Sequence, residues 1–260
     1  MSVGTTALRH RAGHGGFTLI EVLVAVAVML AVVSLLVELF TSANDMSGRG
    51  TGRAMADNEA RVAMQMLSAD LREALADPLL NLRVALDDLT NDTYGVESSE
   101  LYVVTLNADP GTGRAARVVG YEVRASPHDT NRYDLWRGVA EIPFDAAVGA
   151  TGVYDDSRDL RASLLGARWA AVARDVALFR VGTCDTGGTM RTKCDAVDGD
   201  GWPLYVDVYL ELLEERDATK AADMITHGAP DTVWKARLDE WVRRYSSRIH
   251  FDNRNGYRDR

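Results

Sequence analysis

The sequence has few of the residues that most often carry catalysis, with five histidines and two cysteines among 260 residues. His10 and His14 precede the long apolar run, which leaves His128, His227 and His250 for the rest of the chain. None of these three stands in a metal-ligand spacing such as His-Glu-x-x-His. The sequence also has no Gly-x-Ser-x-Gly turn and no phosphate-binding loop. These absences argue against zinc protease, serine hydrolase and nucleotide hydrolase chemistry.

A second catalytic signature lacks its partner. Asp185-Thr186-Gly187 matches the short motif of aspartic proteases, in which two such aspartates share one proton. Only one copy is present. We therefore predict that the protein is not an enzyme, and we assign no catalytic residue.

Positive charge is also in deficit, since 29 basic residues face 38 acidic ones and give a formal charge of -9. Arg9 and Arg11 are the only charged residues among the first sixteen, so removal of residues 1–16 would change the formal charge to -11. Such a surface repels phosphate backbones. Nucleic-acid binding is disfavoured unless a local basic patch exists.

The sequence does contain one long apolar run. Val22 to Val37 holds sixteen residues with no charge and a single hydroxyl, that of Ser34, and Glu21 stands directly before it. A carboxylate inside hydrocarbon costs at least ~2.5–3.5 kcal/mol, so it usually has a functional partner. The run predicts a membrane segment, over residues 17–40, with an acidic residue that needs explaining.

The residues around Glu21 resemble the processing site of type IV pilins and type II secretion pseudopilins. A short basic leader ends in Gly16 and is followed by Phe17-Thr18-Leu19-Ile20-Glu21. The resemblance implies that a prepilin peptidase cuts between Gly16 and Phe17 and N-methylates Phe17. It also implies that the Glu21 carboxylate neutralises the terminal amine of a neighbouring subunit during filament assembly, so that both charges are desolvated as a pair.

The alternative is an ordinary secretory signal or signal anchor. A secretory signal has a small-residue cleavage site after its apolar run. Here that stretch is Thr41-Ser42-Ala43-Asn44-Asp45, which is a poor site, and a cut there would discard Glu21.

The order of segments predicts a single-pass inner-membrane protein. We expect a cytoplasmic leader over 1–16 that is cleaved, a transmembrane helix over 17–40, a flexible break and an amphipathic helix over 41–78, and a periplasmic head over 79–260. Gly48, Gly50 and Gly52 predict a bend or a melted turn in 41–52, because glycine weakens a helix. Pro78 predicts the end of the helix at about Asp77.

The rest of the chain predicts an α+β fold in which the long helix packs on an antiparallel sheet. One stripe of the amphipathic helix is apolar and is expected to pack on the protein's own sheet, while Asp57 and Asp70 lie off it. The stripe is Ala56, Ala60, Met64, Leu67, Leu71 and Leu75. Predicted strands are Leu101–Leu106, Arg117–Arg124, Tyr133–Arg137, Asp175–Val181, Leu204–Leu213 and Ser247–Phe251, the first two as a hairpin. Helices are predicted between Glu214 and Tyr245, broken at Gly228-Ala229-Pro230.

A looser similarity concerns the head. The succession Tyr133-x-Leu135-x-Arg137, Val176-x-x-Phe179 and Trp202-Pro203-x-x-Val206-x-Val208-x-Leu210 resembles minor pseudopilins of the J type and minor pilins of the W type. The helical insertion at 214–245 departs from a compact member of either group.

Two local features have alternative readings. Cys184 and Cys194 are predicted to form a disulfide if the head is exported, and a reactive thiol or a metal pair is the alternative. Asp195, Asp198 and Asp200 form an acidic loop that fits either calcium or a solvated turn. We expect no other cofactor.

The predicted function is that of a structural minor pilin or pseudopilin. Its expected partners are other subunits, the prepilin peptidase and the inner-membrane assembly platform. The alternative is a head that acts as an adhesive or DNA-capturing module through the basic, aromatic tail. We favour a solvated final strand as the explanation of that tail, which holds Arg243, Arg244, Arg248, Arg254, Arg258 and Arg260 with Tyr245, Phe251 and Tyr257.

Overall fold

The computed structural model describes residues 18–74, 82–86, 98–109, 113–143, 164–185, 187–191, 194–195 and 203–251. The chain divides into two units, residues 1–50 and 51–260. Gly16 and Phe17, between which cleavage is predicted, lie outside the described residues.

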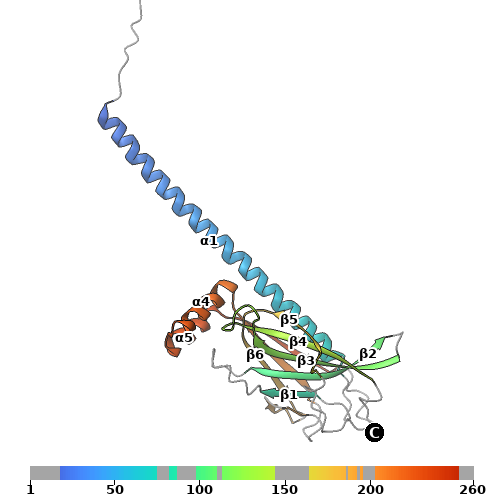
Figure 1. Ribbon diagram of the computed structural model, residues 1–260. Coiled ribbons are helices and arrows are strands. Elements are labelled where there is room, and N and C mark those ends of the chain that lie inside the picture. Colours follow the sequence, from blue (N-terminus) through green and yellow to red (C-terminus); the bar gives the residue numbers. More distant parts are fainter. Residues whose placement is uncertain are drawn as a thin grey trace, which may run out of the picture. The chain divides into compact units, whose positions relative to one another are not determined.

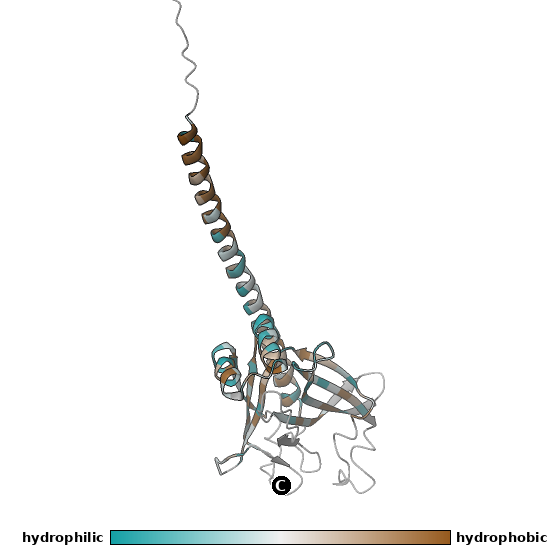
Figure 2. Ribbon diagram, turned by 60° about the vertical axis from the view of Figure 1, so that its left-hand side comes forward, coloured by the Kyte–Doolittle hydropathy of each residue, from teal (hydrophilic) through white to brown (hydrophobic). Residues whose placement is uncertain are grey.

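The first element is α1, a helix over Leu19–Arg72 (Figure 1). Every described residue before Gly52 is exposed. Figure 2 shows the N-terminal part of α1 as a continuous hydrophobic stretch, with polar residues following along the helix. The predicted long helix is therefore present.

The bend or melted turn predicted for residues 41–52 is helical in the structure. The Thr41 hydroxyl donates to the carbonyl oxygens of Val37 and Glu38, at 2.9 Å each. A glycine costs only about 1 kcal/mol relative to alanine, and the hydrogen bonds of a long helix offset a few such costs. Flexibility of this segment in solution stays a prediction.

The helix also ends earlier than Pro78 had predicted. Its last residue is Arg72, and Ala74 already pairs with Thr105 in an antiparallel bridge to strand β2 (Ser99–Asp109). Pairing with a strand requires extended backbone, which is incompatible with one more helical turn. The sheet, rather than the proline, sets this end.

The head contains two antiparallel sheets. The larger has six strands in the order β5-β4-β3-β2-β1-β8. The bounds besides β2 are β1 Leu82–Leu86, β3 Gly113–Ala125, β4 Tyr133–Pro143, β5 Arg168–Ala173 and β8 Cys194–Asp195. Pairing runs from Leu101 with Tyr121 to Asp109 with Gly113, which confirms the predicted hairpin. Strands β1, β5 and β8 were not predicted.

The smaller sheet has four strands in the order β10-β9-β6-β7. Their bounds are β6 Val176–Cys184, β7 Met190–Arg191, β9 Tyr205–Leu212 and β10 Arg243–His250. The alternation of β9 is confirmed, because Val206, Val208 and Leu210 are fully buried while Tyr209 is exposed. Strand β10 begins at Arg243, four residues before its predicted start.

Two helices, α4 (Glu215–Thr226) and α5 (Asp231–Trp241), occupy the predicted helical insertion. Gly228 has φ +71°, the left-handed conformation that favours glycine. Its N–H donates to the Ile225 carbonyl at 3.0 Å, which ends α4 close to the predicted break.

One core joins α1 to both sheets. Ala56, Ala60, Leu67 and Leu71 of the predicted stripe are buried, and Met64 is half-buried against them. The stripe's last residue lies outside the described part of the chain. The prediction that this stripe packs on the protein's own head is confirmed, and so is the α+β fold.

Candidate functional site

The described chain begins at a reciprocal hydrogen-bonded cap. Glu21 Oε2 accepts hydrogen bonds from the Thr18 N–H at 2.9 Å and from the Thr18 hydroxyl at 3.0 Å. The Glu21 N–H in turn donates to Thr18 Oγ1 at 3.3 Å. This is a capping box, in which the first residue and the acid three positions later satisfy each other's free groups. The motif thus fixes the start of α1 as well as placing an acid.

The cap changes the account of the Glu21 charge. The sequence motif predicts one partner for this charge, the amine of a neighbouring subunit. Thr18 supplies two donors from the same chain, and both reach the same oxygen, Oε2. Among the described residues, Thr18 is the one that hydrogen-bonds Glu21, so Oε1 keeps its capacity to accept from another molecule.

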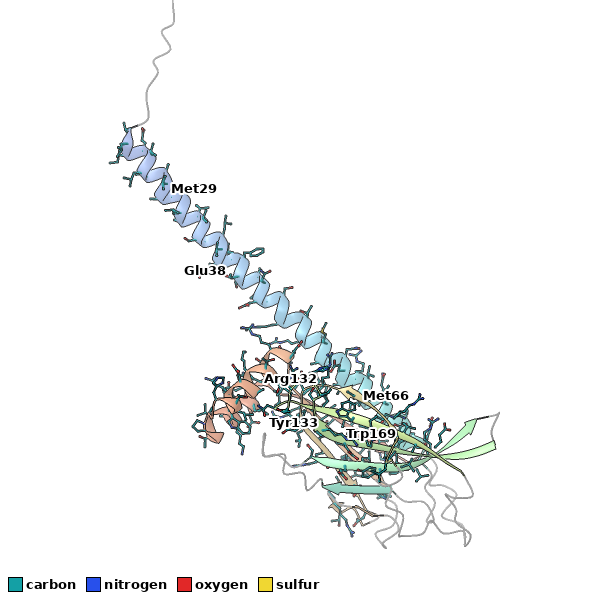
Figure 3. All side chains as sticks on the ribbon, viewed as in Figure 1. Met29, Glu38, Met66, Arg132, Tyr133 and Trp169 are labelled. Carbon is teal, nitrogen blue, oxygen red and sulfur yellow. The ribbon has the colours of Figure 1, made fainter. Side chains whose placement is uncertain are left out.

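Glu21 lies in an apolar surface hollow on α1. Ile20, Val24, Val28 and Met29 line the hollow with it, and their exposed fractions are 50% or more. Figure 3 shows the labelled side chains of Met29 and Glu38 projecting from α1. An exposed apolar surface that follows a whole helix marks a membrane or a protein partner.

The apolar part of α1 is long enough to cross a bilayer. Val22 to Val37 carries no charge, and every one of these residues is exposed. A bilayer core of ~30 Å requires about 20 apolar residues in a helix. Length, composition and exposure together fit a membrane anchor.

Residues 11–37 match the prokaryotic N-terminal methylation motif.

The matched segment contains the predicted cleavage position, Phe17, Thr18, Glu21 and most of the apolar run. It supports a processed pilin or pseudopilin and, with the apolar helix, membrane anchoring. A comparison with curated proteins gives no match. Because the motif stops at residue 37, the similarity of the head to J-type and W-type subunits receives no support.

The predicted disulfide is not supported. Cys184 is a buried, free cysteine at the end of β6, in the four-stranded sheet. Cys194 belongs to β8, in the six-stranded sheet, where its backbone pairs with Val84. A Cys184–Cys194 bond in exported protein remains a prediction.

The predicted calcium loop is only partly described. The backbone of Asp195 pairs with Arg83 of β1, while Asp198 and Asp200 lie outside the described residues. Within the described residues, no group of three or more His, Cys, Asp or Glu side chains is placed to hold a metal ion. Calcium binding remains a prediction.

Asp185, the aspartate of the protease-like motif, organises a turn. Its Oδ1 accepts hydrogen bonds from the backbone N–H groups of Gly187 and Thr189, at 2.9 Å each, and Oδ2 lies 3.1 Å from Arg191 Nη2. The Thr189 N–H, followed by the other donors, holds the pKa of Asp185 below its ordinary value. An ionised, hydrogen-bonded carboxylate of this kind closes the β6–β7 hairpin and is unsuited to sharing a proton.

The basic tail is largely neutralised where it is described. Arg244 Nε lies 2.9 Å from Glu211 Oε1, and Arg248 Nε lies 2.7 Å from Asp207 Oδ1. The Tyr245 hydroxyl binds Asp57 on α1. These contacts make residues 243–250 a structural edge strand, while Arg254, Tyr257, Arg258 and Arg260 lie outside the described residues. The adhesive or DNA-capturing alternative is not favoured.

Proposed function

We propose that this protein is a structural minor subunit of a type IV pilus or of a type II secretion pseudopilus. It enters the inner membrane as a precursor, with its leader in the cytoplasm and its head in the periplasm. A prepilin peptidase cuts it between Gly16 and Phe17 and methylates the new amine. The observation that carries the proposal is the methylation motif over residues 11–37, which includes the start of an exposed apolar helix at Leu19.

Assembly follows from the cost of the Glu21 charge. A carboxylate in hydrocarbon is expensive, and the two Thr18 hydrogen bonds compensate it only in part. The ammonium group of a neighbouring subunit removes most of the remaining cost by pairing with it. Other pilin-like subunits are thus the main partners, with the peptidase and the assembly platform acting before them. No enzymatic activity is proposed.

The first experiment determines the N-terminus of the mature protein. Material from cells that contain the peptidase is expected to begin at Phe17 and to carry one added methyl group, as read by N-terminal sequencing and intact mass. Cells without the peptidase provide the control and should retain residues 1–16. A mature protein that begins near Asn44, or one that retains its leader in the first strain, would refute the proposal.

A second experiment separates anchoring from assembly. Glu21→Ala is expected to stay in the membrane and to be cut normally, but to enter filaments poorly, because the neighbour's ammonium loses its counter-charge. Glu38→Ala is the matched control, since it removes an exposed acid from the other end of the apolar run. Filament fractions are quantified by immunoblot. Equal recovery of Glu21→Ala and the parent would contradict the pairing.

A further inference from the structure

The part of α1 that enters the head is held mainly by polar contacts. Arg53, Asp57 and Glu59 each contact a residue of the head. Arg53 contacts Glu214, Asp57 contacts Tyr245, and Glu59 contacts Arg174. We name these six residues the clasp. Arg53 Nε lies 2.9 Å from its partner, and Glu59 Oε1 lies 2.6 Å from Arg174 Nη2. Residues 53–59 are thus attached to the rest of the head mainly through charged side chains.

Apolar packing contributes little along the same residues. Between Arg53 and Glu59 only Ala56 is buried, and its side chain is a single methyl group. From Ala60 onward the helix is packed differently, because Ala63, Leu67 and Leu71 are fully buried. The strength of attachment therefore changes within one turn, between residues 59 and 60.

An open cleft lies beside the clasp. Gly52, Met55 and Glu59 of α1 line it together with Arg132 and Leu213 of the head. The guanidinium of Arg132, which is labelled in Figure 3, forms an ion pair with Asp175 and not with a residue of α1. Atoms that line a space between a helix and the rest of the head have fewer neighbours and lose dispersion contacts. The cleft is a second, independent sign that this part of α1 is loosely held.

The residues just before the clasp weaken the helix further. A Cβ at Gly48 or Gly50 would meet no heavy atom within 4 Å, and one at Gly52 would come no closer than 3.8 Å to Glu214 Oε2. Packing therefore does not require glycine at these three positions. Their shared effect is to lower the helical stability of the chain that leads into the clasp.

We propose that residues 53–59 of α1 form a releasable segment, which leaves the head when the clasp opens while residues 60–72 stay packed. The inference goes beyond a filament subunit, because it names the contacts that gate the release and the residue at which it stops. The arginine of each ion pair is solvent-accessible, since the Arg53 and Arg174 side chains are 54% and 65% exposed, whereas their partners Glu214 and Glu59 are 10% and 25% exposed. Ionic strength therefore acts directly on the clasp.

Hydrogen exchange of the full chain in lipid nanodiscs tests the proposal. Two peptides are compared, one covering residues 53–59 and one covering 63–72, in ~50 mM and ~500 mM salt. We expect amides of the first peptide to exchange about threefold to tenfold faster at high salt, as exposed ion pairs are screened, and those of the second to stay unchanged. Equal acceleration of both peptides, or no acceleration, would overturn the proposal without the use of any variant.

Variants then assign the effect to the clasp. Glu59→Gln with Glu214→Gln removes two charges and should speed exchange of the first peptide at low salt, leaving little further response to salt. Glu240→Gln is the matched control, because it breaks the exposed Arg237–Glu240 pair of α5, which has no part in the clasp. Gly48→Ala with Gly50→Ala should slow exchange of the first peptide. If the control equals the clasp variant, the clasp does not gate the segment.

These outcomes are distinguishable from failure of the proposed function. Cleavage at Phe17 and the Glu21→Ala result test the filament subunit. Exchange of α1 in nanodiscs depends on neither, so each proposal can fail alone.

Discussion

Arg132 donates two parallel hydrogen bonds to the Asp175 carboxylate, from Nε to Oδ1 at 2.6 Å and from Nη2 to Oδ2 at 2.7 Å. Asp175 joins β5 of one sheet to β6 of the other, and its φ of +56° lies in the left-handed region. Its carbonyl accepts the Leu213 N–H at 2.9 Å. The pair therefore holds a strained corner where the two sheets meet.

This corner predicts a pH dependence. Burial raises the pKa of Asp175 above its ordinary value of 3.8, although the Arg132 hydrogen bonds oppose the rise. The folded state then binds this proton more tightly than the unfolded chain, so the contribution to stability is present below pH 3.8 and is lost as pH rises through the raised pKa. Asp175→Asn, which tolerates the same backbone angle, should remove that part of the slope in urea titrations. Asp223→Asn, at an exposed carboxylate, should leave it unchanged.

The second prediction concerns the attachment of α1 to the large sheet. Asp70 accepts bonds from Arg137 Nε and Nη2, at 2.8 Å each, and one from the Tyr121 hydroxyl. Removing one partner of a buried ion pair leaves the other uncompensated, so Asp70→Ala should cost about 3–5 kcal/mol. Asp57→Ala, at an exposed position of the same helix, should cost less than about 1 kcal/mol. Urea unfolding of the full chain in detergent, followed by tryptophan fluorescence, measures both, and equal losses would contradict the assignment.

The third prediction concerns two glycines on the outer face of the large sheet. A Cβ at Gly138 would lie 2.6 Å from the Trp169 ring, and one at Gly120 would lie 2.5 Å from Leu164 Cδ1. Gly138→Ala and Gly120→Ala should each destabilise the head by about 1–3 kcal/mol, because rings that lie on the backbone must move. Gly48→Ala, whose Cβ meets open space, should be neutral or stabilising. Thermal unfolding measures the stability of each variant. An unchanged melting temperature for Gly138→Ala would show that the Trp169 ring shifts freely.

The fourth prediction concerns the cysteines of the exported protein. We expect Cys184 and Cys194 to be oxidised, with a stabilisation of roughly 2–3 kcal/mol from closing a short loop. Thiol labelling of unfolded protein, with and without reductant, measures this. Full labelling without reductant would show that both cysteines persist as thiols, as Cys184 is in the structure.

Much of the fold was predictable because its signals are local. The alternation of β9, the turn between β2 and β3, and the stripe from Ala56 to Leu71 each follow from residues close together in the sequence. Glu21 was found in the same way, since an acid beside an apolar run is conspicuous. The helix cap formed by Thr18 was not predicted, although a threonine three residues before a glutamate is a capping signal.

The remaining features could not be predicted from the sequence because contacts between distant residues determine them. Strand β5 is Arg-Trp-Ala-Ala-Val-Ala, in which small apolar residues follow one another without alternation, and its pairing with β4 makes it a strand. Asp70 was placed off the packed stripe as an ordinary polar residue, but it is 7% exposed because Arg137, 67 positions away, binds it. The early end of α1 depends likewise on Thr105, a residue of the sheet.

The Thr18–Glu21 cap has one more consequence. Because each newly made chain carries donors for its own acid, a single copy can wait in the bilayer without a companion, at a lower cost than a bare carboxylate would impose. Under the proposed function, a copy that has not yet joined a filament would therefore need no companion subunit to keep this acid in the bilayer.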